Sequence, residues 1–385
     1  MQLRILFCLE KRYNRIQNEL MKEAVIMKKQ RVLNVIKKME SMNLSQMIVT
    51  SPASIYYLTG KWMSVGERMI ALYLNTNGNH KFVVNKLFPI EEDLGIDIVW
   101  FTDSDDSIKI LSDIVEKDKV LGVDKFWPAQ FVIRLMELNA VKSFVNSSNI
   151  IDELRMIKDE EEKELMRKSS QINDRVMKRL WGELKEGYTE KYYARVLAEL
   201  YEEEGAQGFS FDPILAFGAH AADPHHEPDT TKLKKGESLV IDIGGVYNYY
   251  CSDMTRTVFF GEEPSKEDRE IYDIVKNANL NAISKVKEGA KFSEIDGAAR
   301  TYIEERGYGE YFTHRTGHSI GLEIHDKGDV SSINHDEVKE GMIFSIEPGI
   351  YLPNKIGVRI EDLVIVTKEG AEILNSVTKE VTIIK

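Results

Sequence analysis

The chain has 385 residues, and this length favours two domains because single hydrophobic cores rarely grow beyond about 250–300 residues. Its formal net charge of −12 argues against nucleic acid or an anionic membrane as the main partner, since both require a basic surface. The two cysteines, Cys8 and Cys251, exclude a disulfide framework and a thiolate metal cluster, and they favour a reducing cytoplasm.

The N-terminal half predicts an α/β layer. Residues 1–26 lack a transmembrane run and a signal-peptide cleavage site, and we interpret them as an extension that need not be translated, because Met27 begins a cleaner amphipathic helix. Apolar residues at helical spacing predict that helix over 27–43. Strands and helices then alternate. The expected elements are a strand and a helix within 45–60, a hairpin with an Asn-Gly turn over 69–85, a strand over 97–103, a helix over 107–118, a strand over 120–125 and a helix over 128–139.

The C-terminal half predicts a second domain, of α+β type. Residues 147–175 are charged and helical and are expected to bridge the two domains, which places the first at 27–150 and the second at 151–385. The other expected elements are helices continuing to about residue 204, helices over 266–286 and 292–307, and β-hairpins over 239–260 and 342–366.

Four carboxylates interrupt the apolar arms of these two hairpins. Asp242 and Asp253 lie on opposite arms of the first hairpin, where strand pairing can bring them side by side. Glu347 and Glu361 repeat this arrangement in the second. A single such residue would be interpreted as solvent-facing, but a buried carboxylate without a partner is costly. Two matching pairs therefore indicate a site for two divalent cations.

His318 would supply one nitrogen ligand, because its glycine neighbours permit close backbone approach. Oxygen-rich ligation with one imidazole favours manganese, with cobalt or zinc as alternatives, over a structural zinc site. Two such cations can hold a bridging water as hydroxide and polarise a carbonyl, which is the chemistry of amide or ester hydrolysis. His225 and His325 lie in segments beside these ligands, where they can donate a hydrogen bond to an oxyanion or shuttle a proton. Arg359 can pair with a ligand carboxylate.

Around these residues the chain resembles the pita-bread metallopeptidases, which include methionine aminopeptidase, aminopeptidase P and prolidase. The resemblance rests on VIDIGG, CSDMTRT, GHSIGLEIHD, SIEPGIY and GVRIEDLVIV, and it extends from about residue 27 to the end. It is nearest to the prolidase and aminopeptidase P branch, because a creatinase-like α/β domain precedes the pita-bread α+β domain. It implies a homodimeric, cytoplasmic, dinuclear hydrolase that acts on peptides with proline at the second position, as an Xaa-Pro dipeptidase or aminopeptidase.

The resemblance also implies a role for each residue. The implied metal ligands are Asp242 on one ion, His318 and Glu347 on the other, and Asp253 and Glu361 as bridges. The implied catalytic and substrate-binding residues are His225, His325, Glu347 as proton shuttle, Arg359 and Tyr351.

The sequence departs from the family pattern in two places. In the family a proline and a basic residue that can hold a dipeptide carboxylate often follow this histidine, whereas the segment from His325 reads HDKGDVSS, with no proline and no arginine, so the expectation of a strict dipeptidase is weaker. In the loop FGAHAADPHHEP, His220 and Asp223 replace the residues common in relatives, and the substrate pocket is expected to differ. His314 and His335 are interpreted as surface residues.

Two other functions share this fold. A catalytically silent module could keep the fold to bind a peptide or a partner, but such relatives usually lose metal ligands and this chain keeps them. A creatine-type hydrolase would need no metal, and activity that survives a chelator would reveal it. Hydrolysis of Xaa-Pro dipeptides or Xaa-Pro-Xaa tripeptides would distinguish the peptidase from both.

Overall fold

The structure is a computed structural model that describes residues 29–385. The chain separates into two compact units, the first ending at Leu154 and the second beginning at Arg155. The extension proposed for residues 1–26 lies outside the described residues. No helix within residues 29–385 combines the length and the apolar content needed to cross a membrane.

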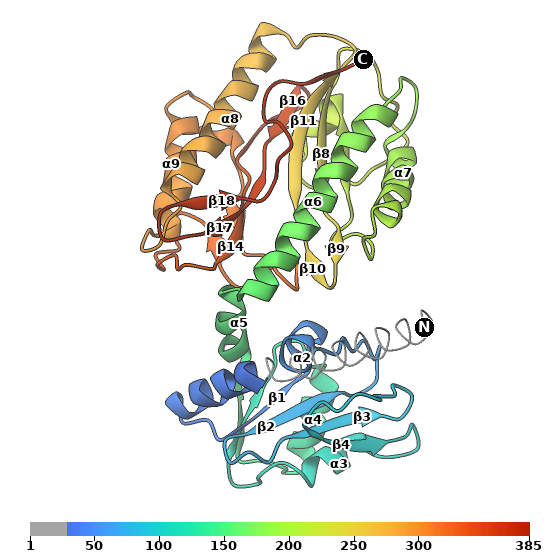
Figure 1. The fold of residues 1–385 in the computed structure, drawn as a ribbon, viewed down its shortest axis with the longest axis vertical. Coiled ribbons are helices and arrows are strands. Elements are labelled where there is room, and N and C mark those ends of the chain that lie inside the picture. Colours follow the sequence, from blue (N-terminus) through green and yellow to red (C-terminus); the bar gives the residue numbers. More distant parts are fainter. Residues whose placement is uncertain (1–28) are drawn as a thin grey trace, which may run out of the picture. The chain divides into compact units, whose positions relative to one another are not determined.

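A six-stranded mixed sheet forms the first unit (Figure 1). In spatial order its strands are β4 (Asp97–Phe101), β3 (Lys81–Asn85), β2 (Ala71–Asn75), β1 (Gln46–Val49), β5 (Val120–Val123) and β6 (Ser143–Asn146). The central strand β1 pairs antiparallel with β2 and parallel with β5. Strands β2 and β3 form the predicted hairpin, and in its turn Asn75 Oδ1 accepts the N–H of Asn77 while Gly78 takes a left-handed φ of +87°.

The helices of this unit start and stop at local sequence signals. They are a helix over 29–41, α2 (Pro52–Thr59), α3 (Ser107–Ser112), α4 (Ala129–Glu137) and α5 (Ser148–Met156), which runs on past the boundary between the units. In α2 the Ser51 side chain accepts the N–H of Ser54 at the start, and Gly60 ends the helix at a φ of +73°. Strand β6 was not predicted, because three of its four residues are exposed and its sequence shows no apolar alternation.

The second unit places helices on both sides of short, mostly antiparallel sheets (Figure 1). Its long helices are α6 (Glu160–Glu183), α7 (Glu190–Glu203), α8 (Lys266–Lys285) and α9 (Phe292–Glu304). A four-stranded sheet contains, in spatial order, β19 (Ile383–Ile384), β11 (Met254–Phe260), β8 (Ser238–Ile243) and β7 (Ile214–Phe217). In this sheet β19 pairs parallel with β11, and the other pairings are antiparallel. A three-stranded sheet contains β14 (Ile343–Ile346), β17 (Asp362–Val366) and β18 (Ala371–Ile373). The two-stranded pairs are β9 (Val246–Tyr247) with β10 (Tyr250–Cys251), β12 (Gly317–His318) with β13 (Asp329–Val330), and β15 (Gly349–Leu352) with β16 (Ile356–Arg359).

Two hydrophobic cores lie on either side of these strands. One packs α8 and α9 against β14, β16 and β17, with Ile271, Phe292 and Val364 fully buried. The other packs α6 and α7 against β7, β8 and β11, with Val176 and Tyr193 fully buried. Every residue of β8 and β11 is buried, so any charge on these strands must be satisfied inside the protein.

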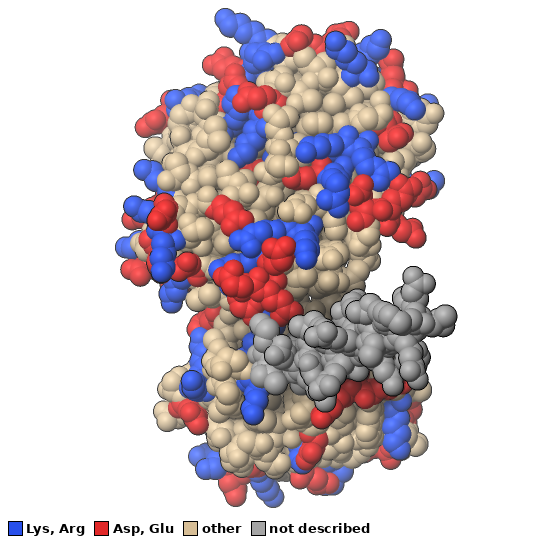
Figure 2. All heavy atoms as spheres, viewed as in Figure 1, with Lys and Arg blue, Asp and Glu red and all other residues tan. Residues whose placement is uncertain are grey.

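Several ion pairs lie on the surface of the second unit. Figure 2 shows Lys and Arg side chains interspersed with Asp and Glu on the face that it draws. On α6, Arg167 pairs with Glu372 of β18 and Arg175 pairs with Glu204 at the end of α7, each at 2.6 Å. Exposed pairs of this kind contribute roughly 0–1 kcal/mol each, so burial in the two cores remains the main source of stability.

Candidate metal centre

The first hairpin brings Asp242 and Asp253 together. Asp242 of β8 lies opposite Thr255 of β11, and Asp253 precedes Thr255 by two positions, so the two carboxylates are diagonal neighbours on one face. At the tip of the predicted hairpin, between these two residues, the structure forms a second small hairpin from β9 and β10. A Cβ on Gly244 would lie 2.1 Å from the Ser252 carbonyl oxygen, so only glycine fits where the chain leaves β8.

The second hairpin is interrupted where its two glutamates lie. One half pairs β14 with β17 and the other pairs β15 with β16. The same register runs through both halves and places Glu347 opposite Glu361 in the gap between them. Thr255 joins this gap to the first hairpin: its Oγ1 donates to Glu361 Oε2 at 2.8 Å, and its carbonyl accepts the Glu361 N–H at 3.1 Å.

His318 reaches the same place from β12. Its Nε2 lies 3.4 Å from Asp253 Oδ2 and 3.5 Å from Glu347 Oε1. Ser345 Oγ accepts the backbone N–H of His318 at 3.0 Å and donates to Glu347 Oε1 at 3.1 Å. One serine therefore positions both the imidazole and a carboxylate.

Replacing Gly317 with Ala should destabilise the protein, because the added Cβ would lie 1.8 Å from the Ser345 carbonyl oxygen. Overpacking of this kind typically costs about 1–3 kcal/mol. Thermal unfolding should show a lower Tm and a smaller stabilisation by added Mn²⁺, since His318 is displaced. Gly297→Ala in α9 is the matched control, because its Cβ would meet nothing within 4 Å and alanine favours a helix. Equal Tm values for the two variants would contradict the argument.

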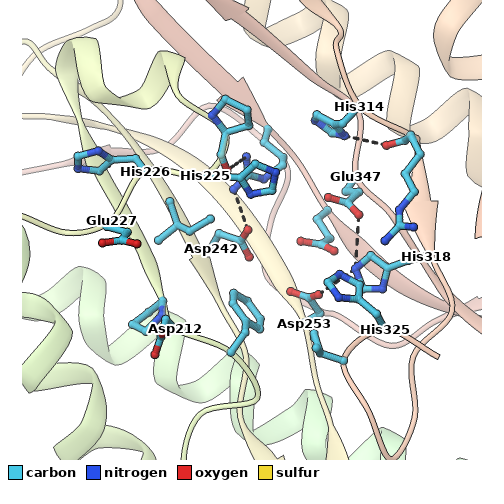
Figure 3. Close-up of a pocket in the computed structure, with 18 of the residues that line it drawn as sticks. Asp212, His225, His226, Glu227, Asp242, Asp253, His314, His318, His325 and Glu347 are labelled. Atoms are coloured by element: carbon cyan, nitrogen blue, oxygen red, sulfur yellow. Dashed lines mark hydrogen bonds and ion pairs between the residues drawn. The ribbon is translucent and has the colours of Figure 1, made fainter. Parts of the chain in front are cut away.

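All five predicted ligands line one cavity of about 500 Å³, and Figure 3 shows Asp253, His318 and Glu347 pointing toward one another. Ligand atoms of Asp253, His318 and Glu361 lie within 4.8 Å of one another. Among residues 29–385, Asp242 Oδ1, Asp253 Oδ1 and Glu361 Oε1 are buried oxygens that lack a hydrogen-bond partner. Such oxygens are costly to leave unpaired, and an oxygen-rich set with one imidazole fits divalent cations.

Burial and mutual repulsion act on these carboxylates. Burial raises the pKa of Asp253 well above its usual range, and the charges of Asp242 and Glu347 raise it further. The pKa of Glu361 is raised by burial and then by the charge of Asp253. The protein groups alone therefore disfavour ionising the whole set, and a cation between the carboxylates would reverse that preference.

Two predicted histidines line the same cavity. Figure 3 shows His325 beside His318, and the centroids of their rings are 4.4 Å apart. The side chain of His325 is exposed, and its partial burial lowers the pKa to about 4, with a further contribution from His318, so His325 is neutral at pH 7. His225 is exposed in the loop after Pro224 and also lines the cavity. A neutral imidazole can donate one hydrogen bond and accept another.

Arg359 supports Asp242 from the protein interior. It is buried, and it donates from Nη2 to Asp242 Oδ2 at 2.7 Å and from Nη1 to the Tyr351 hydroxyl at 2.9 Å. This contact orients the carboxylate and leaves Asp242 Oδ1 for another partner. Tyr351 is itself buried, and its hydroxyl contacts His314 Nε2 at 2.8 Å. It is not among the residues that line the cavity, and its role in substrate binding stays a prediction.

His314 corrects the prediction of a surface residue. It is half-buried and lines the cavity together with Arg315, whereas His335 is exposed as expected. Burial lowers the pKa of His314 below its usual value. The chain bends at His314 and Thr316 before β12 begins, so no strand-like spacing in the sequence marks His314 as a cavity residue.

Comparison with known proteins adds independent matches. Residues 164–368 match the model of Metallopeptidase family M24, and residues 31–157 match the Creatinase/Prolidase N-terminal domain. An uncharacterized peptidase of Staphylococcus aureus (strain MW2) is 36% identical over 353 residues, which cover 91% of this chain and 99% of that protein.

Two solved structures are also similar. A prolidase from Thermococcus sibiricus is 35% identical with a TM-score of 0.87, over 92% of this chain and 98% of that one. An X-Pro aminopeptidase from Thermotoga maritima is 29% identical with a TM-score of 0.80, over 90% of this chain and 99% of that one.

These matches confirm the predicted order of domains, creatinase-like first and pita-bread second. The segment that matches the peptidase model contains all four carboxylates and the imidazole that converge on the cavity. The chain therefore belongs to metallopeptidase family M24, with a creatinase/prolidase N-terminal domain ahead of its peptidase domain.

Proposed function

We propose that the protein is an Xaa-Pro peptidase, which hydrolyses the bond between an N-terminal residue and a following proline. The observation that carries the proposal is the convergence of five metal-ligand side chains on a cavity that histidines also line. The similarity to a prolidase and to an X-Pro aminopeptidase supports the same specificity. The proposed ligands are Asp242, Asp253, His318, Glu347 and Glu361.

Two divalent cations held by these ligands would supply an activated water and a polarised carbonyl. The side chains of the protein then bind the substrate and move protons. Glu347 lines the cavity with 16% of its side chain exposed, and it is placed to accept the proton of the attacking water and deliver it to the leaving proline nitrogen. His225 and His325 donate N–H groups to the carbonyl oxygen as it gains negative charge. Arg359 keeps Asp242 oriented throughout.

Manganese is the ion that we propose, with cobalt or zinc as alternatives, because four of the five ligands offer oxygen. Metal analysis of protein isolated without added metal would identify it. We also propose a homodimer in a reducing cytoplasm, from the family resemblance and the presence of only two cysteines. Light scattering would test the dimer.

The metal-loaded protein should release the N-terminal residue from Xaa-Pro dipeptides or Xaa-Pro-Xaa tripeptides, as followed by mass spectrometry. A chelator should abolish this activity. A protein that carries two metal ions and cleaves neither peptide would contradict the proposal and would fit a silent peptide-binding module. Activity that persists in the chelator would instead indicate a creatine-type hydrolase.

The structure also suggests which residue holds the C-terminal end of a short substrate. The side chain of Asp326, which follows His325, is buried and pairs with Arg155 at 2.5 Å and with Lys158 at 3.4 Å, so this carboxylate points inward. Arg315 is exposed and lines the cavity. We infer that Arg315 binds the carboxylate of a dipeptide substrate.

Replacing Arg315 with Ala should raise KM for an Xaa-Pro dipeptide by roughly 10-fold or more, because a charge-assisted hydrogen bond contributes about 1.5–3 kcal/mol. An Xaa-Pro amide, which lacks that carboxylate, should show no change in KM, and neither should the Lys327→Ala control, since Lys327 does not line the cavity. Steady-state kinetics on both substrates measures this. An equal effect on dipeptide and amide would contradict the role and favour an aminopeptidase for longer peptides.

A further inference from the structure

A second cluster of metal-ligating side chains lies apart from the five proposed ligands. Glu190, His220, His226 and Asp229 each offer one ligand atom, and these atoms lie within 4.8 Å of one another. Glu190 is the first residue of α7, and His220 belongs to the 3-10 helix η1 (Gly218–Ala222). The other two follow in the loop before β8. The proposed peptidase chemistry uses none of the four.

The side chains converge on the carboxylate of Glu190. This carboxylate is fully buried, with Oε1 3.1 Å from His220 Nδ1 and Oε2 2.7 Å from His226 Nε2. The two imidazole rings face each other, with centroids 4.2 Å apart and an interplanar angle of 37°. The backbone N–H groups of Phe217 and Asp229 also donate to the carboxylate, each at 2.9 Å, and fix its orientation.

The charges of this cluster are not balanced by a permanent cation. Within residues 29–385, the ion-pair partners of Glu190 are the two histidines alone, and these are charged only when protonated. Asp229 adds a second negative charge, because hydrogen bonds from Thr231 lower its pKa to about 2. Whenever both imidazoles are unprotonated, the two carboxylates leave two negative charges, which one divalent cation would neutralise.

We propose that this cluster is a separate site for one divalent transition-metal ion, for which zinc is best suited. Two imidazoles and two carboxylates make a four-ligand set of the kind that zinc binds tetrahedrally, whereas calcium and magnesium favour oxygen ligands alone. His226 directly follows His225 and also lines the cavity. A bound ion would therefore tie the start of α7 to the loop that carries His225, and would hold that histidine at the cavity.

Zinc binding in an Asp253→Asn background tests this site while the catalytic centre is disabled. After dialysis against buffered zinc, elemental analysis should find one zinc ion fewer per chain in Asp253→Asn/His220→Ala than in Asp253→Asn alone. Thermal unfolding should agree: zinc should raise the Tm of the single variant by more than that of the double variant. His335→Ala in the same background is the matched control, because His335 is an exposed histidine outside the cluster, and it should change neither result.

Equal zinc contents in the single and double variants would overturn the second site. The cluster would then be a set of hydrogen bonds that holds the two histidines against Glu190. If His220→Ala disturbs the fold, as seen by circular dichroism, Asp229→Asn decides the question because it preserves the side-chain shape. If Asp253→Asn/Asp229→Asn holds one zinc ion fewer per chain than Asp253→Asn alone, the result supports the site. An unchanged zinc content overturns it. A protein that binds this zinc but cleaves no Xaa-Pro peptide would contradict the proposed function alone.

Discussion

Replacing Asp253 with Asn should remove bound metal and activity together. Asp253 is buried, its Oδ2 lies 3.4 Å from His318 Nε2, and its Oδ1 has no hydrogen-bond partner among the described residues. Asparagine keeps the shape but loses the charge and one ligand oxygen. We expect kcat/KM to fall on the order of 1,000-fold or more, beyond the roughly 10–100-fold typical of residues that only hold a ligand in place. Elemental analysis should show a parallel loss of manganese.

The same substitution should stabilise the metal-free protein. Burial and then the charge of Asp242 raise the pKa of Asp253 in the folded state, so its ionised form opposes folding at pH values above its unfolded pKa. Asparagine removes this penalty, and each unit of raised pKa corresponds to about 1.4 kcal/mol. In a chelator at pH 7, the variant should therefore have the higher Tm.

The difference in Tm should shrink as the pH falls toward about 4, where Asp253 is increasingly protonated in both states. Asp97→Asn is the control, because Asp97 is an exposed carboxylate of the other unit and pairs with Lys81. A metal-free Asp253→Asn protein that unfolds at a lower temperature than the wild type would show that repulsion within the carboxylate set is not the dominant force.

Much of the fold was predictable because local signals and burial agree. The hairpin of β2 and β3 carries its own turn residues, and β8 and β11 are apolar enough to be recognised as strands. Strand β6 could not be recognised from the sequence, because its residues are mostly exposed and its position is set by pairing with β5. The small hairpin of β9 and β10 was also missed, because four strand residues around Asn248 and Tyr249 give too short a pattern.

The proposed ligands were identifiable because each carboxylate interrupts an apolar strand, an anomaly visible in sequence. His314 offers no such anomaly, and only the folded structure places it at the cavity. Glu190 could not be identified as a ligand from the sequence for another reason. It is one acidic residue in the first turn of a charged helix, which is a common arrangement. Its contacts with His220 and His226 join segments some 30 or more residues apart, which sequence spacing does not report.

Replacing His225 with Ala should lower turnover while the metal ions stay bound. His225 is exposed in a loop, lines the cavity and offers no atom to the cluster of Asp253, His318 and Glu361. Losing one donor to a developing oxyanion costs about 100- to 1,000-fold in kcat. Metal content and Tm should match the wild type, and His335→Ala should leave all three quantities unchanged. Loss of metal from the His225 variant would place this residue among the ligands instead.

Replacing His325 as well as His225 shows whether the two histidines donate hydrogen bonds to the same oxygen of the substrate. If both donate to one oxyanion, removing either leaves the other to carry the remaining stabilisation, so the loss in the double variant should differ from the product of the two single losses. Because the pKa of His325 is about 4, its neutral form predominates at pH 7 and above. The comparison can therefore be made at constant protonation of His325, and independent, multiplicative losses would assign the two histidines to different atoms of the substrate.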